Sequence, residues 1–132
     1  MFAASESVGF IDFEIHSCYR DAERQVLLFE RDPVSGLTAR PGQSEHQTGL
    51  AMGIGTWRGP FLSEANAAHR DWVARHCWDF GFVVRYPEGH EDVTGIAFEP
   101  WHLRFVGREV AQEMKRHGWV LEEWHEAMLG GR

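Results

Sequence analysis

The chain has 132 residues, of which 43% are hydrophobic and 25% are charged, and its formal net charge is −7. This length and composition indicate one globular domain over residues 1–132, since domains commonly contain about 100–200 residues, and they exclude a disordered chain. The acidic balance argues against nonspecific nucleic-acid binding, which depends on basic residues that neutralise phosphates. No apolar run approaches the roughly 20 residues of a membrane-spanning helix. We expect a monomer with no membrane span.

The first ten residues lack the basic start and the long apolar stretch of a secretory signal peptide. The chain is therefore expected to be cytoplasmic or leaderless, unless its start has been trimmed from a cell-envelope protein. The two cysteines, Cys18 and Cys77, form no CxxC arrangement, so they are expected to be buried thiols and not zinc ligands.

The first half of the chain predicts two strands, one helix and a long loop. Residues 10–15 alternate and predict a strand. Residues 21–30 are rich in helix formers and predict a helix that Asp21 caps. Glycine and proline residues favour a loop over 32–48, and the short apolar run over 49–54 predicts a buried strand.

The second half begins with the longest predicted helix, over residues 63–80, with Ser63 as its N-cap and Gly81 as its end. The remaining predictions, in chain order, are a strand over 82–86, a polar turn over 87–94, strand pieces over 96–98 and 101–105, and helices over 107–117 and 121–129. This order predicts the α+β class, with a small, mostly antiparallel sheet and flanking helices.

Two segments carry residue types that bind metals and transfer protons. His46 ends the predicted loop, directly before a predicted strand, and Glu99 stands three positions before His102. A catalytic zinc commonly takes three protein ligands, and a nearby carboxylate acts as general base. On spacing alone, the alternative remains open that His46 is a hydrogen-bonded loop residue and that Glu99 and His102 lie on a solvated edge.

Three longer strings around these residues follow one pattern in one order. The first is SCYRDAERQVLLF, the second is ARPGQSEHQTGLAMGIG, and the third is GFVVRYPEGHEDVTGIAFEPWHLRFVG. They resemble the Ser-Gly-Tyr-Arg-Ser, Ser-x-His-x-x-Gly-x-Ala-x-Asp and Glu-Pro-Trp-His segments of the D-alanyl-D-alanine carboxypeptidases of the vancomycin-resistance type. The resemblance covers residues 15–107. It implies the α+β fold that these peptidases share with the signalling domain of hedgehog proteins.

The resemblance also implies a zinc centre. His46 and His102 match the two zinc-binding histidines of the family, and Glu99 matches the catalytic glutamate that activates the zinc-bound water. Zinc would polarise the scissile carbonyl and lower the pKa of its bound water.

The same resemblance implies a substrate site for a peptidoglycan stem peptide or another peptide that ends in D-Ala-D-Ala. Arg20 matches the arginine of substrate recognition and catalysis, and Gln25 and Ser44 match polar positions that line the substrate site. An arginine can bind a terminal carboxylate with two parallel hydrogen bonds.

One position departs from the family pattern. The third zinc ligand of the family is an Asp seven positions after the first histidine, and here that position is Gly53. Glycine has no side chain to bind a metal, and residues 46–63 contain no Asp or Glu. The resemblance therefore implies that zinc is weakly held, unless another ligand is recruited.

Three functions remain open from the sequence. The first is a zinc D,D-carboxypeptidase that releases the terminal D-alanine from stem peptides, weakened or inactivated by Gly53. The second is a D,D-dipeptidase or a phage-type cell-wall endopeptidase of the same family. The third is a non-catalytic peptide-binding relative, which the glycine at position 53 favours.

Overall fold

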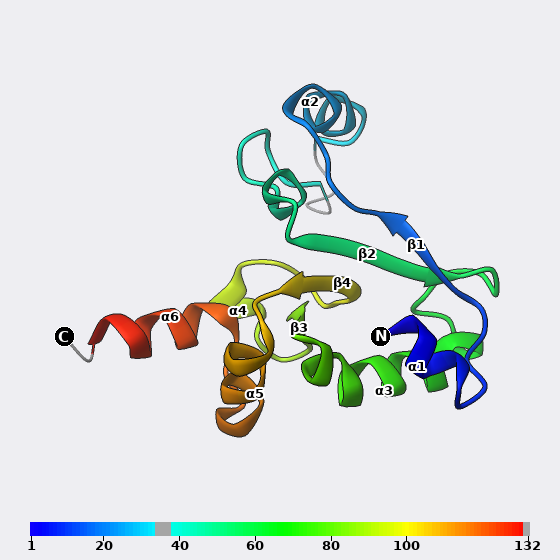
Figure 1. Ribbon diagram of the computed structural model, residues 1–132. Helices are drawn as coiled ribbons and strands as arrows, with labels where there is room; N and C mark the ends of the chain where they lie inside the picture. The colour runs from blue at the N-terminus through cyan, green and yellow to red at the C-terminus, as the bar shows by residue number, and fades with distance from the viewer. Residues whose placement is uncertain (34–37, 131–132) are drawn as a thin grey trace.

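A four-stranded sheet organises the described residues, 1–33 and 38–130, in this computed structural model (Figure 1). The helices and strands are α1 (Phe2–Glu6), β1 (Phe13–Ser17), α2 (Ala22–Arg31), η1 (Glu45–Thr48), β2 (Ala51–Thr56), η2 (Glu64–Asn66), α3 (Ala67–His76), η3 (Cys77–Phe80), β3 (Phe82–Tyr86), α4 (Glu91–Thr94), β4 (Glu99–Phe105), α5 (Arg108–His117) and α6 (Leu121–Gly130), where η denotes a 3-10 helix. Among the described residues, no helix is long and apolar enough to cross a membrane.

The sheet has the strand order β1-β2-β4-β3, and all three pairings are antiparallel. This arrangement confirms the predicted α+β class with a small antiparallel sheet. Gly53 in the central strand β2 lies opposite Ser17 of β1 on one side and opposite His102 of β4 on the other. Because directly opposed residues point to the same face of a sheet, these three positions share one face.

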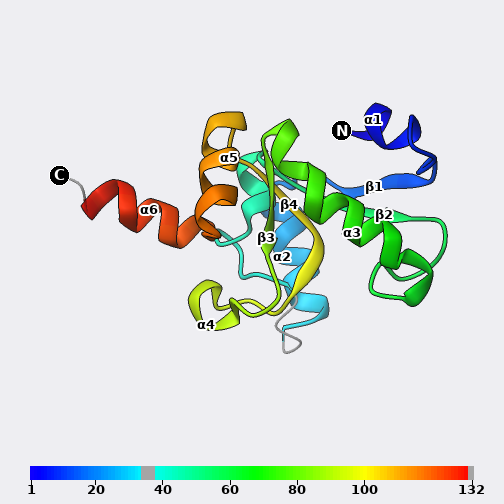
Figure 2. The ribbon, with the colours of Figure 1, turned by 90° about the horizontal axis from the view of Figure 1, so that it is seen from below.

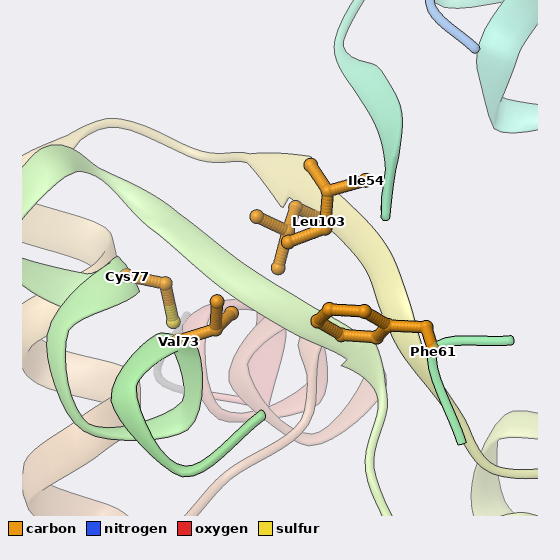
Figure 3. Packing of buried hydrophobic residues seen from close by; sticks show 5 residues of the cluster. All are labelled: Ile54, Phe61, Val73, Cys77 and Leu103. Carbon is orange, nitrogen blue, oxygen red and sulfur yellow. The ribbon is translucent and has the colours of Figure 1, made fainter. Parts of the chain in front are cut away.

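The two faces of the sheet have different neighbours. Helices α3 and α5 lie against one face, whereas α2 and the segment before β2 lie on the other side (Figures 1 and 2). On the α3 side, Ile54 and Leu103 pack with Val73, Cys77 and Phe61 in a buried cluster (Figure 3). A second cluster, beneath α5, contains Val83, Ala111 and Met114.

The helix predicted over residues 63–80 is divided into three parts, η2, α3 and η3. Ser63 makes no side-chain capping hydrogen bond. The fully buried side chain of Asn66 instead accepts a hydrogen bond from the Thr56 hydroxyl at 2.6 Å and donates one to the Pro60 carbonyl at 3.0 Å. These bonds hold Asn66 outside the α-helical conformation, and the α-helix begins one residue later. The end at Gly81 is confirmed, in the left-handed conformation.

Other boundaries also differ from the predictions. The first strand begins at Phe13, and Ile15 is 52% exposed although it lies opposite the buried Ile54, because β1 is an edge strand. The last strand is one continuous element through Pro100, with no strand over 96–98. Its pairing with β3 shifts register around Pro100, as expected for a residue that cannot donate to the ladder.

Short helices occupy three segments that were not predicted as helical. They are α1 at the start, η1 at the end of the predicted loop, and α4 in the predicted turn over 87–94. Part of that loop, residues 34–37, lies outside the described residues. The cysteine prediction holds for Cys77, which is buried, but is wrong for Cys18, which is exposed because it follows the end of an edge strand.

Candidate active site

His46 is positioned by η1 and by one hydrogen bond to a distant part of the chain. Its ring is buried, and its Nδ1–H donates to the carbonyl oxygen of Cys18 at 2.7 Å. Because a carbonyl only accepts, this bond assigns the ring proton to Nδ1 and leaves the Nε2 lone pair available. Burial lowers the pKa of His46, although the hydrogen bond to Cys18 opposes the shift, so the neutral imidazole that a metal requires is favoured.

His102 comes from β4, on the face of the sheet opposite the core. The rings of His46 and His102 have centroids 5.0 Å apart, and both side chains are buried. His102 Nδ1 lies 3.2 Å from Glu99 Oε2. Burial opposes protonation of His102, but the neighbouring carboxylates of Glu45 and Glu99 raise its pKa overall. The two histidines and the carboxylate that the sequence singled out therefore lie side by side.

Arg20 and Gln25 form a connected pair beside this group. Arg20 Nη1 donates to Gln25 Oε1 at 2.8 Å, and Gln25 Nε2 donates to the Ala39 carbonyl at 2.6 Å. The Arg20 backbone N–H also donates to the His46 carbonyl at 3.0 Å. Because Gln25 is fully buried in α2, its amide fixes the direction of the Arg20 guanidinium.

A pocket of about 60 Å³ joins these residues. It is lined by Arg20, Ala39, Gln43, Ser44, Glu45, His46, Tyr86, Ile96, Glu99 and His102. Five residues singled out from the sequence, Arg20, Ser44, His46, Glu99 and His102, thus line one pocket. Gln25 does not line the pocket, but it contacts it indirectly because its side chain is hydrogen-bonded to Arg20.

Four residues around the histidines have no predicted role from the sequence. Glu45 Oε1 accepts a hydrogen bond from Arg85 Nε at 2.7 Å and forms an ion pair with Arg104 Nη1 at 2.9 Å. Burial would raise the pKa of Glu45, but its interactions with His102, Arg85 and Arg104 lower it to about 2. Tyr86 packs edge-on against the His102 ring, with centroids 4.9 Å apart, and burial raises the pKa of its phenol to about 12.

A sequence signal existed for two of the four. Arg85 and Tyr86 belong to the Arg-Tyr-Pro string that the family resemblance included, although no role was attached to them. Glu45 occupies a variable position of the Ser-x-His motif, and Arg104 stands in a strand. Their pairing with each other depends on the fold, so no local pattern identified it.

Gly53 faces the same side of the sheet as His102 and supplies no ligand. A Cβ atom at this position would lie 2.5 Å from Ser17 Oγ, so the serine hydroxyl occupies the space of the absent side chain. Within the described part of the chain, no group of three or more His, Cys, Asp or Glu residues has a geometry that could hold a metal ion. The two imidazoles fit two positions of a zinc coordination shell, and residue 53 leaves the third without a protein ligand.

Two curated relatives resemble most of this chain. A D-alanyl-D-alanine carboxypeptidase of Enterococcus faecium is 37% identical over 117 residues, which cover 88% of this chain and 37% of that protein. The bifunctional D-Ala-D-Ala dipeptidase and carboxypeptidase VanXYC of Enterococcus gallinarum is 39% identical over 129 residues, which cover 87% of this chain and 67% of that protein. The chain therefore spans only part of the length of these relatives.

Solved structures of carboxypeptidases share the fold of this chain. The LD-carboxypeptidase LdcB matches with a TM-score of 0.85 and 38% identity, covering 96% of this chain and 63% of that chain. VanYB in complex with D-alanine-D-alanine matches with a TM-score of 0.83 and 29% identity, covering 95% and 76%. A mutant of a VanY D,D-pentapeptidase in complex with Zn(II) matches with a TM-score of 0.80 and 29% identity, covering 93% and 76%.

A protein-family match covers most of the chain. Residues 1–108 match the model of the VanY family, described as D-alanyl-D-alanine carboxypeptidase. That range contains every residue that lines the pocket, from Arg20 to His102. Together with the identities and the shared fold, this match shows that the chain belongs to the VanY family of D-alanyl-D-alanine carboxypeptidases.

Proposed function

We propose that this chain is a zinc-dependent carboxypeptidase of the D,D type that releases the terminal D-alanine from peptidoglycan stem peptides, with activity reduced by Gly53. One observation carries the proposal. Arg20, His46, Glu99 and His102 line the same pocket, which brings a carboxylate-binding group beside a base and two metal-binding imidazoles. The membership of the VanY family supports the same reaction class.

Zinc would be held by His46 and His102, and the vacancy at residue 53 makes that binding weak. When bound, zinc polarises a carbonyl group and lowers the pKa of its water. The Nδ1–H bond from His46 to the Cys18 carbonyl keeps Nε2 unprotonated, as a ligand must be. A VanY neighbour in complex with Zn(II) supports this choice of metal.

Three side chains bind the substrate and transfer protons. Arg20, held by Gln25, binds the terminal carboxylate of the peptide with its planar fork and so places the scissile bond beside Glu99. Glu99 takes the proton from the attacking water and passes it to the amine of the leaving D-alanine. The phenol of Tyr86 stays neutral because burial raises its pKa to about 12, so it can donate a hydrogen bond toward the pocket.

Two observations favour second candidates. The likeness to an LD-carboxypeptidase favours stem peptides that have already lost their last D-alanine as substrates. The glycine at position 53 favours a peptide-binding relative without catalysis. The D,D-dipeptidase and endopeptidase alternatives have the same machinery and differ only in the peptide that they accept.

The test is a zinc titration together with an assay of D-alanine release, on the unchanged chain and on Gly53→Asp. Substrates are one peptide that ends in D-Ala-D-Ala and one that ends in a single D-Ala after an L-centre. We expect weak zinc binding and slow release in the unchanged chain, and gains in both for Gly53→Asp. Release without a gain in Gly53→Asp means that another group fills the vacancy. Peptide binding without release in either protein favours the non-catalytic relative.

A further inference from the structure

Arg85 is a largely buried arginine to which the proposed reaction assigns no role. The pairing of β3 with β4 shifts register between Val84 and Tyr86, because residues 100–102 of β4 all lie opposite Arg85. Irregular pairing of this kind redirects side chains, and it is common beside active sites. Consecutive residues of a regular strand point to opposite faces, but here the guanidinium carbon of Arg85 lies 4.9 Å from the centroid of the Tyr86 ring.

All three nitrogen atoms of the Arg85 guanidinium are bound to carboxylates. Nε donates to Glu45 Oε1 at 2.7 Å. Nη1 and Nη2 donate to the two carboxylate oxygens of Glu122, at 2.9 and 2.5 Å, in the paired geometry that arginine and carboxylate favour. The side chains of Arg85, Glu45 and Glu122 are 10%, 14% and 32% exposed, so these contacts are screened less than those of a surface ion pair. The guanidinium is therefore fixed in one position.

Glu122 stands in the first turn of α6, and that turn is held against α5. The Trp124 indole N–H donates to Glu113 Oε2 at 2.9 Å, and Leu121 and Trp124 pack against the buried cluster beneath α5. Residues 125–130 are exposed, and α6 extends away from the sheet there (Figures 1 and 2). The contact of α6 with the residues around the pocket is therefore made by its first turn, through Glu122.

Tyr86 connects this group of charges to the candidate active site. It is one of the described residues that line the pocket, and Arg85 and Glu122 are not. A cation beside an aromatic ring is attracted to the ring, more strongly where solvent is excluded. The ring of Tyr86 also packs edge-on against His102. Arg85 and His102 thus fix the ring, and with it the direction of the phenol.

We propose that Arg85 and Glu122 are positioning residues for Tyr86, so that the first turn of α6 supports the wall of the substrate pocket. Glu122 holds the guanidinium, the guanidinium holds the ring, and the phenol donates a hydrogen bond to the bound peptide. Glu122 lies outside residues 1–108, which match the VanY family, so family membership alone does not assign this role. The contact with the peptide rests on the proposed function, but the position of the ring does not.

The first experiment follows the Tyr86 ring by NMR with ring-labelled tyrosine, without metal or peptide. The chain has two tyrosines, and Tyr19 is 69% exposed, so it serves as the internal reference. In the unchanged chain we expect nuclear Overhauser effects between the Tyr86 ring and the Arg85 side chain. In Glu122→Gln one acceptor becomes a donor, so the paired contact is lost and the Tyr86 resonances should shift or broaden. Glu126→Gln, on the exposed part of α6, is the matched control and should leave both tyrosines unchanged.

Two results of this experiment overturn the proposal. The first is an unchanged chain that shows no nuclear Overhauser effect between Tyr86 and Arg85. The second is a Glu122→Gln protein whose Tyr86 resonances equal those of the unchanged chain. The first result requires no variant, so it decides the matter even if Glu122→Gln does not fold.

The second experiment measures, by calorimetric titration, the affinity for a peptide that ends in D-Ala-D-Ala. Glu122→Gln should weaken binding by about two- to tenfold, as for the loss of one neutral hydrogen bond, and Glu126→Gln should not. In a Tyr86→Phe background Glu122→Gln should have no further effect, because the hydroxyl through which it acts is absent. Equal losses in both backgrounds reject the positioning role. An unchanged chain that binds no peptide contradicts the proposed function instead, and the NMR measurement still decides whether Glu122 and Arg85 position the ring.

Discussion

Residue 53 lies between Ser17 and His102, and the absence of a side chain affects both neighbours. On the His102 side, the missing side chain leaves no ligand at residue 53 on the face that holds the two imidazoles. Toward Ser17 it opens space that the serine hydroxyl fills, 2.5 Å from where a Cβ atom would be placed. The backbone at this glycine is not in the left-handed region, so crowding by the serine is what opposes an aspartate here.

Restoring the aspartate should therefore work better when the serine hydroxyl is removed. We expect the double variant Gly53→Asp with Ser17→Ala to bind zinc about tenfold more tightly than Gly53→Asp alone, which corresponds to about 1.4 kcal/mol of relieved crowding. The Ser17 Cβ atom is 3.8 Å from the new Cβ position and can stay. Isothermal titration with zinc measures the difference, and Ser17→Ala alone is the control. Equal affinities of the single and double variants would mean that the serine rotates away at no cost.

Arg20 is the second residue whose chemistry can be tested alone. Arg20→Lys keeps the positive charge but loses the planar fork, and an ammonium group cannot hold Gln25 Oε1 in the same geometry. We expect binding of a D-Ala-D-Ala-terminated peptide to weaken by about tenfold, as for the loss of one charge-assisted hydrogen bond. Calorimetric titration provides the dissociation constant, and Arg31→Lys at the exposed end of α2 serves as control. Unchanged affinity in Arg20→Lys would remove the bidentate contact from the mechanism.

At the scale of elements, the sequence predicted what local patterns encode. The capped helix from Asp21, the left-handed end at Gly81 and the strand over Phe82–Tyr86 all follow from short-range signals, and all three are present. The boundaries that differ depend on tertiary contacts. The buried Asn66 side chain delays α3, and an edge position leaves Ile15 exposed. Neither feature can be derived from a local pattern, because each depends on how other elements are placed in the fold.

The salt-bridge network of Glu45 joins four elements, η1, β3, β4 and α6, and it predicts a pH dependence. Despite the opposing effect of burial, interactions with His102, Arg85 and Arg104 lower the pKa of Glu45 from 4.5 to about 2 in the folded protein. A carboxyl group whose pKa is lower in the folded than in the unfolded protein stabilises the fold at pH values above its unfolded-state pKa. This contribution is lost as the pH falls through the folded-state pKa. The free energy of unfolding should therefore fall between pH 4.5 and about 2, in part through Glu45.

Urea unfolding across that interval tests the contribution. Glu45→Gln has no carboxylate to protonate at this position, so we expect its free energy of unfolding to depend less on pH than that of the unchanged chain. Glu30→Gln, at an exposed position in α2, removes an equal charge outside the network and should keep the pH dependence of the unchanged chain. Parallel curves for the unchanged chain and Glu45→Gln would show that the network does not couple to stability.

At the scale of the whole molecule, a buried apolar cluster and the candidate active site lie on opposite faces of the sheet. The buried cluster around Leu103 lies on the α3 side of the sheet, whereas the neighbouring residue His102 points to the opposite face, where its ring meets that of His46. The motif order predicted which residues would meet across 82 positions of sequence, from Arg20 to His102, because a family pattern encodes the fold that joins them. The arginine and glutamate network behind them has no such pattern, and only the folded chain brings it together.

This separation predicts that the fold does not depend on a metal. Addition of a chelator should leave the thermal midpoint of the unchanged chain where it was, since two apolar clusters and a four-stranded sheet hold the chain together without the histidines. In Gly53→Asp, zinc at 100 times its dissociation constant should add about 2.7 kcal/mol, or about 10 °C in the midpoint. Differential scanning calorimetry with and without zinc measures both effects. A midpoint that falls in the unchanged chain when the chelator is added would show that the metal is a structural element of the fold.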